Sequence, residues 1–211
     1  MDIQSLNVSG KTVLVRVDFN VPVKDKNVTD TTRIEAAKPT IDYLLEQGAA
    51  VILMSHRGRP KGEYDEGFSM EPVRQAAEKV LGKEIIPMFS ERVVDDHVVA
   101  MARNLKPGDI GLLENLRFRN EEKKNDPAFA KELASLADCY VNDAFGTAHR
   151  AHASNVGIVK ELPSALGFLM GKEVKVLSEL LNNPKRPFIA ILGGAKVSDK
   201  IAVIEHLIDV C

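Results

Sequence analysis

Residues 141–154 read VNDAFGTAHRAHAS, and this stretch decides how the chain is organised. An apolar run over 139–141 leads into it, and a loop of small residues then holds His149, Arg150 and His152. This layout is typical of a buried strand that delivers cationic side chains at its carboxyl end. Open α/β sheets bind their ligands at that end of their strands.

The same layout recurs at three other places. Residues 13–20 (VLVRVDFN), 51–59 (VILMSHRGR) and 110–119 (IGLLENLRFR) each place polar side chains directly after an apolar run. Three of the four strand ends carry a cluster of Arg or His. Because parallel strands end at the same edge of a sheet, we expect these groups to form a pocket for an anion.

Helical periodicity fills the segments between these strands. We predict a helix from about residue 30 to Gly48, with Pro39 inside it, and further helices over 70–81, 95–105, 125–137 and 162–182. We also predict a short strand over 84–88, whose Pro87 suits a strand at the edge of the sheet. The charged run 121–124 is predicted to be a solvated face. The alternation of strands and helices predicts an α/β fold with a doubly wound parallel sheet, Rossmann-like and three-layered.

Residues 182–187, NNPKRP, have the composition of a linker. A strand over 187–192, a glycine-rich turn and a helix to about residue 210 are predicted to follow. One strand–helix unit cannot bury its own apolar faces. We therefore assign 1–184 to a first domain, and 185–211 to a linker and the opening unit of a second domain that is mostly absent.

Charge and composition restrict the partners. The chain has 28 Lys and Arg against 30 Asp and Glu, a formal net charge of −2, whereas nucleic-acid-binding domains usually carry a basic excess. Basic clusters on a neutral background favour a focused site for a small anion.

The chain also lacks the signals of export and membrane insertion. Its first residues have no signal-peptide pattern, and no window approaches the ~20 apolar residues of a membrane span. Cys139 and Cys211 have no metal spacing and are too few for a disulfide framework, so Cys139 is predicted to be a small buried side chain. We expect a soluble, cytoplasmic protein with no nucleic-acid or membrane partner.

Several candidate residues also have simpler interpretations. Asp18 and Asn20 could satisfy local backbone donors in a turn. Arg33 lies in the first turn of its helix, where the dipole favours anions, yet it could equally be an exposed solvated arginine. The motif GGAKVSDK, 193–200, is not a Walker A loop, and it could be a helix N-terminus with two solvated lysines.

The Arg and His residues are a stronger signal together than singly. A phosphate dianion gives up hydration at a cost of several kcal/mol, and each charge-assisted hydrogen bond returns roughly 1.5–3 kcal/mol. Two or more bidentate arginines with help from histidine can therefore hold a small phosphorylated acid. Arginine at four separate places supports this interpretation: Arg33, Arg59, Arg117 and Arg150.

Six stretches of the chain resemble the successive signatures of the phosphoglycerate kinase family. They are VLVRVDFNVPV, TRIEAAKPTIDYL, SHRGRPKG, LLENLRFRNEE, VNDAFGTAHRAHAS and ILGGAKVSDK. They lie in order between residues 13 and 200, and six ordered matches are highly specific. The resemblance implies a two-domain enzyme that moves a phosphoryl group reversibly between ATP and the carboxylate of 3-phosphoglycerate, giving 1,3-bisphosphoglycerate.

The resemblance also implies roles for individual residues. Asp18 and Asn20 would contact the hydroxyl and carboxylate end of the acid, and Phe19, Arg57 and Gly58 belong to the same acid-binding motifs. His56, Arg59, Arg117 and Arg150 would form a basic cradle, chiefly for the 3-phosphate. Arg33 would neutralise the carboxylate and the phosphoryl group in flight. Lys196 would steady the transferring group, and Lys200, with Gly193 and Gly194, would hold nucleotide phosphate.

The family uses ATP or ADP with Mg²⁺, but most of the nucleotide domain is missing, and we assign no metal ligand in these residues. The family usually has an aliphatic residue where Arg57 stands, so this charge could alter loop packing or anion affinity. We expect the full enzyme to be a monomer and this piece to bind the acid without turnover, with self-association possible. A non-catalytic anion-binding module and a structural fragment with a collapsed site remain alternatives.

Overall fold

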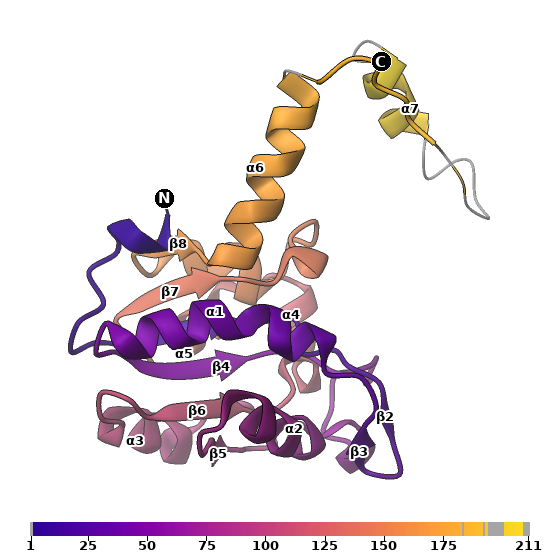
Figure 1. Cartoon of the computed structure of the whole chain (residues 1–211). Helices are drawn as coiled ribbons and strands as arrows, with labels where there is room; N and C mark the ends of the chain where they lie inside the picture. Colours follow the sequence, from indigo (N-terminus) through magenta and orange to yellow (C-terminus); the bar gives the residue numbers. More distant parts are fainter. Residues whose placement is uncertain (1, 183, 192, 194–200, 209–211) are drawn as a thin grey trace. The chain divides into compact units, whose positions relative to one another are not determined.

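A computed structural model describes residues 2–182, 184–191, 193 and 201–208 of the protein (Figure 1). It divides into two compact units, Met1–Gly171 and Lys172–Cys211. The first unit contains the main sheet and its covering helices. The second contains α7 (Ile201–Ile208) and most of α6 (Phe168–Asn182).

The first unit is built on a six-stranded sheet in the order β5-β6-β4-β1-β7-β8. Every pair of neighbouring strands is parallel. The strands are β1 (Thr12–Arg16), β4 (Ala50–Met54), β5 (Ile86–Met88), β6 (Ile110–Leu113), β7 (Cys139–Asn142) and β8 (Ser164–Leu166). The predicted doubly wound parallel sheet is confirmed, and the strand that contains Pro87 lies at an edge.

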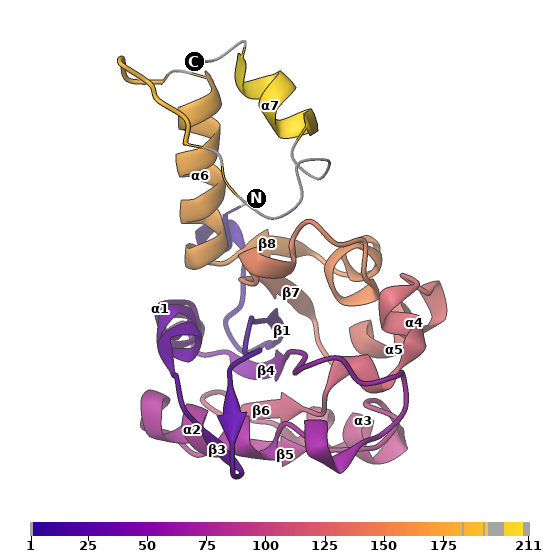
Figure 2. The ribbon, with the colours of Figure 1, turned by 90° about the vertical axis from the view of Figure 1, so that its right-hand side faces the viewer.

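Helices cover both faces of this sheet (Figure 2). The strands alternate: Val13 and Val15 join the core shared with α1 (Thr32–Glu46) and α2 (Glu71–Leu81), whereas Leu14 joins the core shared with α3 (Asp96–Asn104) and α5 (Pro127–Ala134). Near-continuous apolar strands are required because both faces are buried. Cys139, 1% exposed, is buried in the first of these cores as predicted.

The remaining elements are short. They are α4 (Asn120–Lys123), the hairpin of β2 (Val23–Lys24) and β3 (Asn27–Val28), the single turns Ile3–Ser5, Glu66–Phe68, Leu116–Phe118, Phe145–Thr147 and Ile158–Lys160, and the π-helical turn Ala153–Gly157.

Local sequence explains where the helices begin and end. Gly82 ends α2 in the left-handed conformation at φ 67°. Asp126 accepts hydrogen bonds from the first backbone N–H groups of α5, whose first residue is Pro127. α1 runs through Pro39 without ending there.

The predicted helix over 162–182 is wrong in its first part. Residues 164–166 form β8, which pairs with β7, and α6 begins only at Phe168. Tertiary contacts decide this boundary, because Gly167 N–H donates to the carbonyl of Asn142 (2.9 Å) and Met170 N–H donates to Asp143 Oδ1 (3.1 Å). The end of β7 thus fixes the start of the helix.

The predicted solvated face at 121–124 is also wrong in one residue. Glu122 is 0% exposed, because α4 turns it inward toward Ser154. Its neighbours Glu121, Lys123 and Lys124 remain partly or fully exposed.

In the second unit, the predicted strand over 187–192 is absent from its described residues, 187–191. Ile189 and Ile191 are 76% and 93% exposed. A strand needs a neighbour for its backbone hydrogen bonds, and residues 187–191 pair with none of the strands that the structure describes. Gly193 lies outside regular structure, and Gly194, Lys196 and Lys200 fall outside the described residues. Of the helices that the structure describes, none has both the length and the hydrophobicity of a membrane span.

Candidate anion-binding site

Four strands of the first unit deliver their polar residues to one edge of the sheet. β1 leads to Asp18 and Asn20, β4 to His56, β6 to Arg117, and β7 to the loop that carries Arg150. The strand order explains this convergence: β4 and β7 flank β1 on either side, so the connections diverge there. Such a switch point is where open α/β sheets bind ligands.

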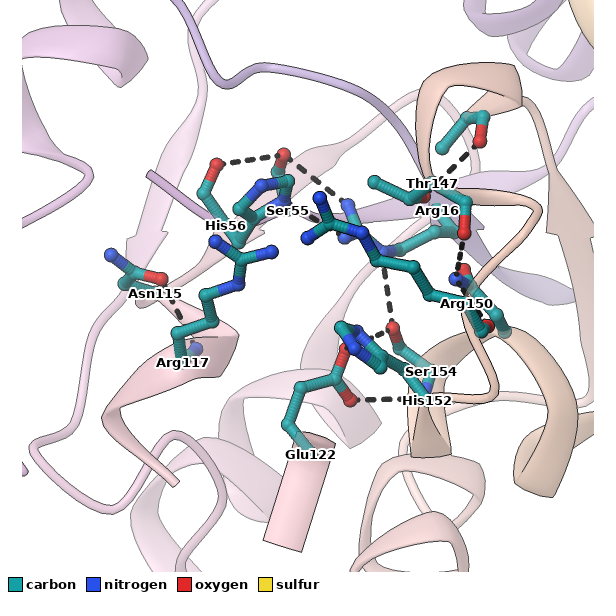
Figure 3. Close-up of polar contacts among 12 residues, drawn as sticks. Arg16, Ser55, His56, Asn115, Arg117, Glu122, Thr147, Arg150, His152 and Ser154 are labelled. Carbon is teal, nitrogen blue, oxygen red and sulfur yellow. Dashed lines mark hydrogen bonds and ion pairs between the residues drawn. The ribbon is translucent and has the colours of Figure 1, made fainter. Parts of the chain in front are cut away.

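Six basic side chains gather at this edge, and we call them the basic cluster: Arg16, His56, Arg59, Arg117, Arg150 and His152. Burial, and then the charges of Arg150, Arg16 and Arg59, lower the pKa of Arg117 to about 10. In Figure 3 the side chains of Arg117 and Arg150 extend toward each other, with His56 and Arg16 close by. Like charges held together in this way favour an anion between them.

Arg117 is anchored at one atom and unpaired at another. Its side chain is buried, and Nη1 donates to the carbonyl of Gly58 (2.7 Å). Among the residues that the structure describes, the buried Nε has no hydrogen-bond partner. The backbone around it is fixed by Asn115, whose Oδ1 accepts from the N–H groups of Arg57 (3.2 Å) and Arg117 (3.1 Å). A buried guanidinium nitrogen without a partner is unusual, and it indicates a place for an acceptor.

His56 stays neutral in this surrounding. Burial, followed by the charges of Arg16, Arg117 and Arg150, lowers the pKa of His56 to about 2. Its Nδ1 lies 3.1 Å from Nη2 of Arg16. A neutral imidazole can act as a hydrogen-bond donor to an anion without adding charge to the cluster.

Arg16 of the cluster is hydrogen-bonded into a buried network with Ser154 and Glu122, and sequence reasoning did not select any of these three residues. Arg16 is 1% exposed, and its Nε donates to Ser154 Oγ (3.1 Å). Ser154 Oγ donates to Glu122 Oε1 (2.6 Å) and Ser154 N–H donates to Oε2 (3.0 Å).

The charge of Glu122 balances that of Arg16. Burial alone would raise the pKa of Glu122, but the contact with His152, the charge of Arg16 and the hydrogen bonds from Ser154 lower it below its usual range. An arginine within an apolar strand was the available sequence signal, because a buried charge needs a partner.

Asp18 and Arg33 form a more exposed border. Arg33 Nη1 donates to Asp18 Oδ2 at 2.9 Å, and the Arg33 side chain is 51% exposed. The charge of Asp18 also acts on Arg16. A Cβ at Gly146 would lie 2.6 Å from Asp18 Oδ2, so glycine lets the loop after β7 approach this carboxylate. Asn20 Oδ1 accepts from Gly58 N–H (2.9 Å).

Two of the sequence-selected residues, Phe19 and Arg57, have side chains directed elsewhere, and a third, Gly58, contributes through its backbone. The Phe19 side chain is 0% exposed in the hydrophobic core. Arg57 donates to the carbonyls of Ser69 (3.0 Å) and Gly67 and lies over the ring of Phe68. Gly58 adopts φ 61°, and a Cβ there would overlap the ring of Phe68, so its contribution is conformational.

The charged side chains of this site are mainly those that bind anions. Among the residues that the structure describes, no group of three or more His, Cys, Asp or Glu side chains is arranged to hold an ion. The charged side chains at the strand ends are mainly guanidinium donors, which suit phosphate and carboxylate oxygens.

The fold and the cluster define a class: a doubly wound α/β protein that gathers buried arginines and histidines at the carboxyl ends of its strands. A family model described as phosphoglycerate kinase matches residues 3–211. The chain belongs to the phosphoglycerate kinase family.

Individual relatives agree with this assignment. The sequence is 58% identical to the phosphoglycerate kinase of Finegoldia magna over 207 residues, which are 98% of this chain and 52% of that relative. It is 56% identical to the phosphoglycerate kinase of Moorella thermoacetica over 208 residues, which are 99% of this chain and 52% of that relative. The solved phosphoglycerate kinase structures from Coxiella burnetii (39% identity) and Pyrococcus horikoshii OT3 (35% identity) match with TM-scores of 0.87 and 0.88, over 99% of this chain and 52% of theirs. The chain therefore spans about half the length of these relatives.

Proposed function

We propose that this chain is the acid-binding part of a phosphoglycerate kinase, that it binds 3-phosphoglycerate at the basic cluster, and that it does not transfer phosphate by itself. In the whole enzyme the reaction is reversible phosphoryl transfer between ATP and the carboxylate of 3-phosphoglycerate, with 1,3-bisphosphoglycerate as product. Such an enzyme works in the cytoplasm, in glycolysis and gluconeogenesis.

The state of Arg117 carries the proposal. Its guanidinium is buried, its Nε has no hydrogen-bond partner in the described part of the chain, and the charges of Arg150, Arg16 and Arg59 lower its pKa. A phosphate dianion would supply both the missing acceptor and the missing negative charge. Each charge-assisted hydrogen bond contributes roughly 1.5–3 kcal/mol, so a few of them offset the dehydration of the ligand.

The phosphate position follows from the cluster. Arg59, Arg117 and Arg150 would hold the 3-phosphate as bidentate donors, and His56 would add a neutral donor. The opposite end of the acid would lie toward Asp18 and Asn20. Arg33, half-exposed at the border and paired with Asp18, would exchange that carboxylate for the carboxylate and transferring phosphoryl group of the substrate. These roles are positioning and charge neutralisation, which phosphoryl transfer requires.

The nucleotide side belongs to the second part of the chain. We propose 1–184 as the acid-binding domain and 185–211 as a linker with the opening unit of the nucleotide domain. Gly193, Gly194, Lys196 and Lys200 would then approach the phosphates of ATP or ADP, and Mg²⁺ would come with the nucleotide. Closure of the two domains would exclude water during transfer. The full-length enzyme would act as a monomer, and the shorter chain could self-associate.

Calorimetric titration of 3-phosphoglycerate into the 211-residue chain tests this function. Saturable binding is expected, and Arg150→Ala or Arg59→Ala should weaken it at least about tenfold, since each removes a charge-assisted contact. Arg103→Ala, an exposed arginine on α3, is the matched control and should bind like the unchanged chain. Equal losses in all three variants would contradict the assignment of the cluster.

Two further ligands separate the alternatives. Inorganic phosphate that binds as tightly as 3-phosphoglycerate would support an anion-binding module instead. The absence of any binding would support a structural fragment with a collapsed site. ATP should bind weakly or not at all, and turnover near typical kinase rates by this chain would contradict its assignment as the acid-binding part.

A further inference from the structure

The contact between Arg16 and His56 determines where the imidazole carries its proton. Nη2 of Arg16 lies 3.1 Å from Nδ1 of His56. A guanidinium has donors and no acceptor, so Nδ1 must accept. Because His56 is neutral in this environment, its single ring proton must then be on Nε2.

The Nε2 atom is the one left for a ligand. Among the residues that the structure describes, Nε2 of His56 has no hydrogen-bond partner. This nitrogen is also not fully buried, so a ligand can reach it. The charged groups that act on His56 are Arg16, Arg117, Arg150 and His152. An Nε2–H group among these cations has an obvious acceptor in the phosphate that we propose there.

Arg16 cannot easily turn away from Nδ1, because its other donors are occupied. Nε donates to Ser154 Oγ (3.1 Å), and Nη1 donates to the carbonyl of Val17 and to Ser55 Oγ (3.3 Å). Three contacts, with residues from three segments of the chain, thus hold one buried guanidinium against His56.

Glu122 and Ser154 complete the support. Glu122 accepts both the hydroxyl (2.6 Å) and the backbone N–H (3.0 Å) of Ser154. The hydroxyl of Tyr140 donates to the Ser154 carbonyl (2.8 Å), which fixes the serine from a third direction. Glu122 therefore both balances the charge of Arg16 and holds the serine that orients it (Figure 3).

We propose that Arg16, Ser154 and Glu122 are positioning residues that fix His56 as the Nε2–H tautomer, with that N–H presented to the phosphate of the acid. The identity of the ligand rests on the proposed function, whereas the tautomer does not. The histidine serves as a permanently oriented neutral donor. His56 itself then makes no contribution to the pH dependence of binding near pH 6.

Nitrogen-15 NMR of the ligand-free 211-residue chain tests the tautomer directly. The His56 signals, assigned by their loss in His56→Gln, should show a protonated Nε2 and an unprotonated Nδ1 between about pH 5.5 and 8, the range in which a free histidine titrates. His97, exposed on α3, provides the internal comparison. A proton on Nδ1, a rapid mixture of tautomers, or protonation of His56 in this range would overturn the proposal.

Two variants test the positioning network. Arg16→Met combined with Glu122→Met removes both charges together, which buried ion pairs often tolerate, and Ser154→Ala removes only the connecting hydroxyl. In the double variant His56 should lose its single tautomer, and the dissociation constant for 3-phosphoglycerate should rise about tenfold or more. Ser154→Ala should shift both readouts in the same direction by less, whereas Ser135→Ala, an exposed serine after α5, should change neither.

The outcomes separate this proposal from the proposed function. A double variant that retains the Nε2–H tautomer would overturn the positioning role. Loss of the tautomer with unchanged affinity would overturn the contact between Nε2–H and the phosphate. Failure of the unchanged chain to bind 3-phosphoglycerate would overturn the proposed function alone, because the NMR result requires no ligand.

Discussion

Two buried glutamates of this protein have opposite ionisation behaviour. Glu114, at the end of β6, accepts from Met70 N–H (2.7 Å), Asn115 N–H (2.9 Å) and Ser69 Oγ (2.9 Å), and burial raises its pKa. Glu122, on α4, is equally buried and also accepts hydrogen bonds, yet its pKa is lowered.

The difference lies in the cations. Glu122 contacts His152 (3.5 Å between Nδ1 and Oε1) and is linked through Ser154 to Arg16. Glu114 is held by uncharged donors, and burial outweighs both their hydrogen bonds and the charge of Arg57, which act to lower its pKa. Burial therefore acts to raise the pKa of both carboxyl groups, and the cations beside Glu122 reverse the direction of its shift. Glu122 is placed near cationic side chains, whereas Glu114 accepts hydrogen bonds from backbone N–H groups and a serine hydroxyl.

The largest expected effect comes from breaking the charged region. Glu122→Leu leaves Arg16 buried without its counter-charge, and this should lower the free energy of unfolding by about 3–5 kcal/mol. Urea denaturation followed by circular dichroism measures the change. Glu121→Leu, the neighbouring residue in an exposed ion pair with Arg119, should cost less than about 1 kcal/mol. Similar losses in both variants would mean that the buried charge is not balanced as described.

The next effect is the response of His56 to pH. The unfolded histidine takes up a proton below about pH 6.5, whereas the folded one does so only near its pKa of about 2. Acid therefore favours the unfolded chain throughout this window. Between about pH 7 and pH 5 the unchanged chain should lose about 2 kcal/mol more unfolding free energy than His56→Asn, measured by denaturation at each pH. Parallel pH profiles would contradict the neutral His56.

The region of Glu114 should respond in the opposite direction. The pKa of Glu114 is higher in the folded chain than in the unfolded chain. Protonation of Glu114 therefore stabilises the fold; this stabilisation is complete below the pKa of the unfolded chain and is lost as the pH rises through the pKa of the folded chain. Glu114→Gln keeps an acceptor for the backbone donors and should cost about 1 kcal/mol. Thermal or urea unfolding should show this cost growing as pH is lowered from neutral toward the usual glutamate range. A cost that instead grows with rising pH would show that Glu114 prefers to be charged in the folded protein.

The smallest effect is expected at Arg57, which belongs to the region of Glu114. Its guanidinium contacts the carbonyls of Ser69 and Gly67 and not the basic cluster. Arg57→Leu should therefore alter the affinity for 3-phosphoglycerate by less than about twofold, while it lowers stability by roughly 0.5–1.5 kcal/mol through the lost hydrogen bonds. Calorimetric titration of Arg57→Leu and Arg59→Ala with 3-phosphoglycerate compares the two positions. A loss of affinity in Arg57→Leu as large as that in Arg59→Ala would place Arg57 in the anion site.

Periodicity and strand ends were enough to predict much of this molecule. Apolar runs that end in polar residues gave the parallel sheet, and the parallel direction of the strands brought His56, Arg59, Arg117 and Arg150 to one edge. These features are predictable because they depend on local pattern and on one rule of sheet geometry.

The missed features depend on contacts between segments far apart in the sequence. Glu122 looks like part of a solvated charge run, and only the 153–157 turn, packed against it, makes it a buried counter-ion. β8 has a helical pattern, but pairing with β7 overrides that preference. Arg57 carries a positive charge and lies in the same loop as Arg59, which made it a candidate for the anion site. Its side chain instead turns toward carbonyl groups ten and twelve residues further along the chain.

Asn115 illustrates how narrow a chemical requirement this arrangement imposes. Its Oδ1 accepts from two backbone N–H groups, and its Nδ2 donates to the carbonyls of Arg57 (2.8 Å) and Phe68 (2.9 Å), so the amide uses its whole donor and acceptor capacity. Deamidation would replace that NH₂ with an oxygen of almost the same size, facing two carbonyl oxygens. A change too small to alter the side-chain volume would thus set a carboxylate against the carbonyls of Arg57 and Phe68 and loosen the two loop segments that Asn115 joins.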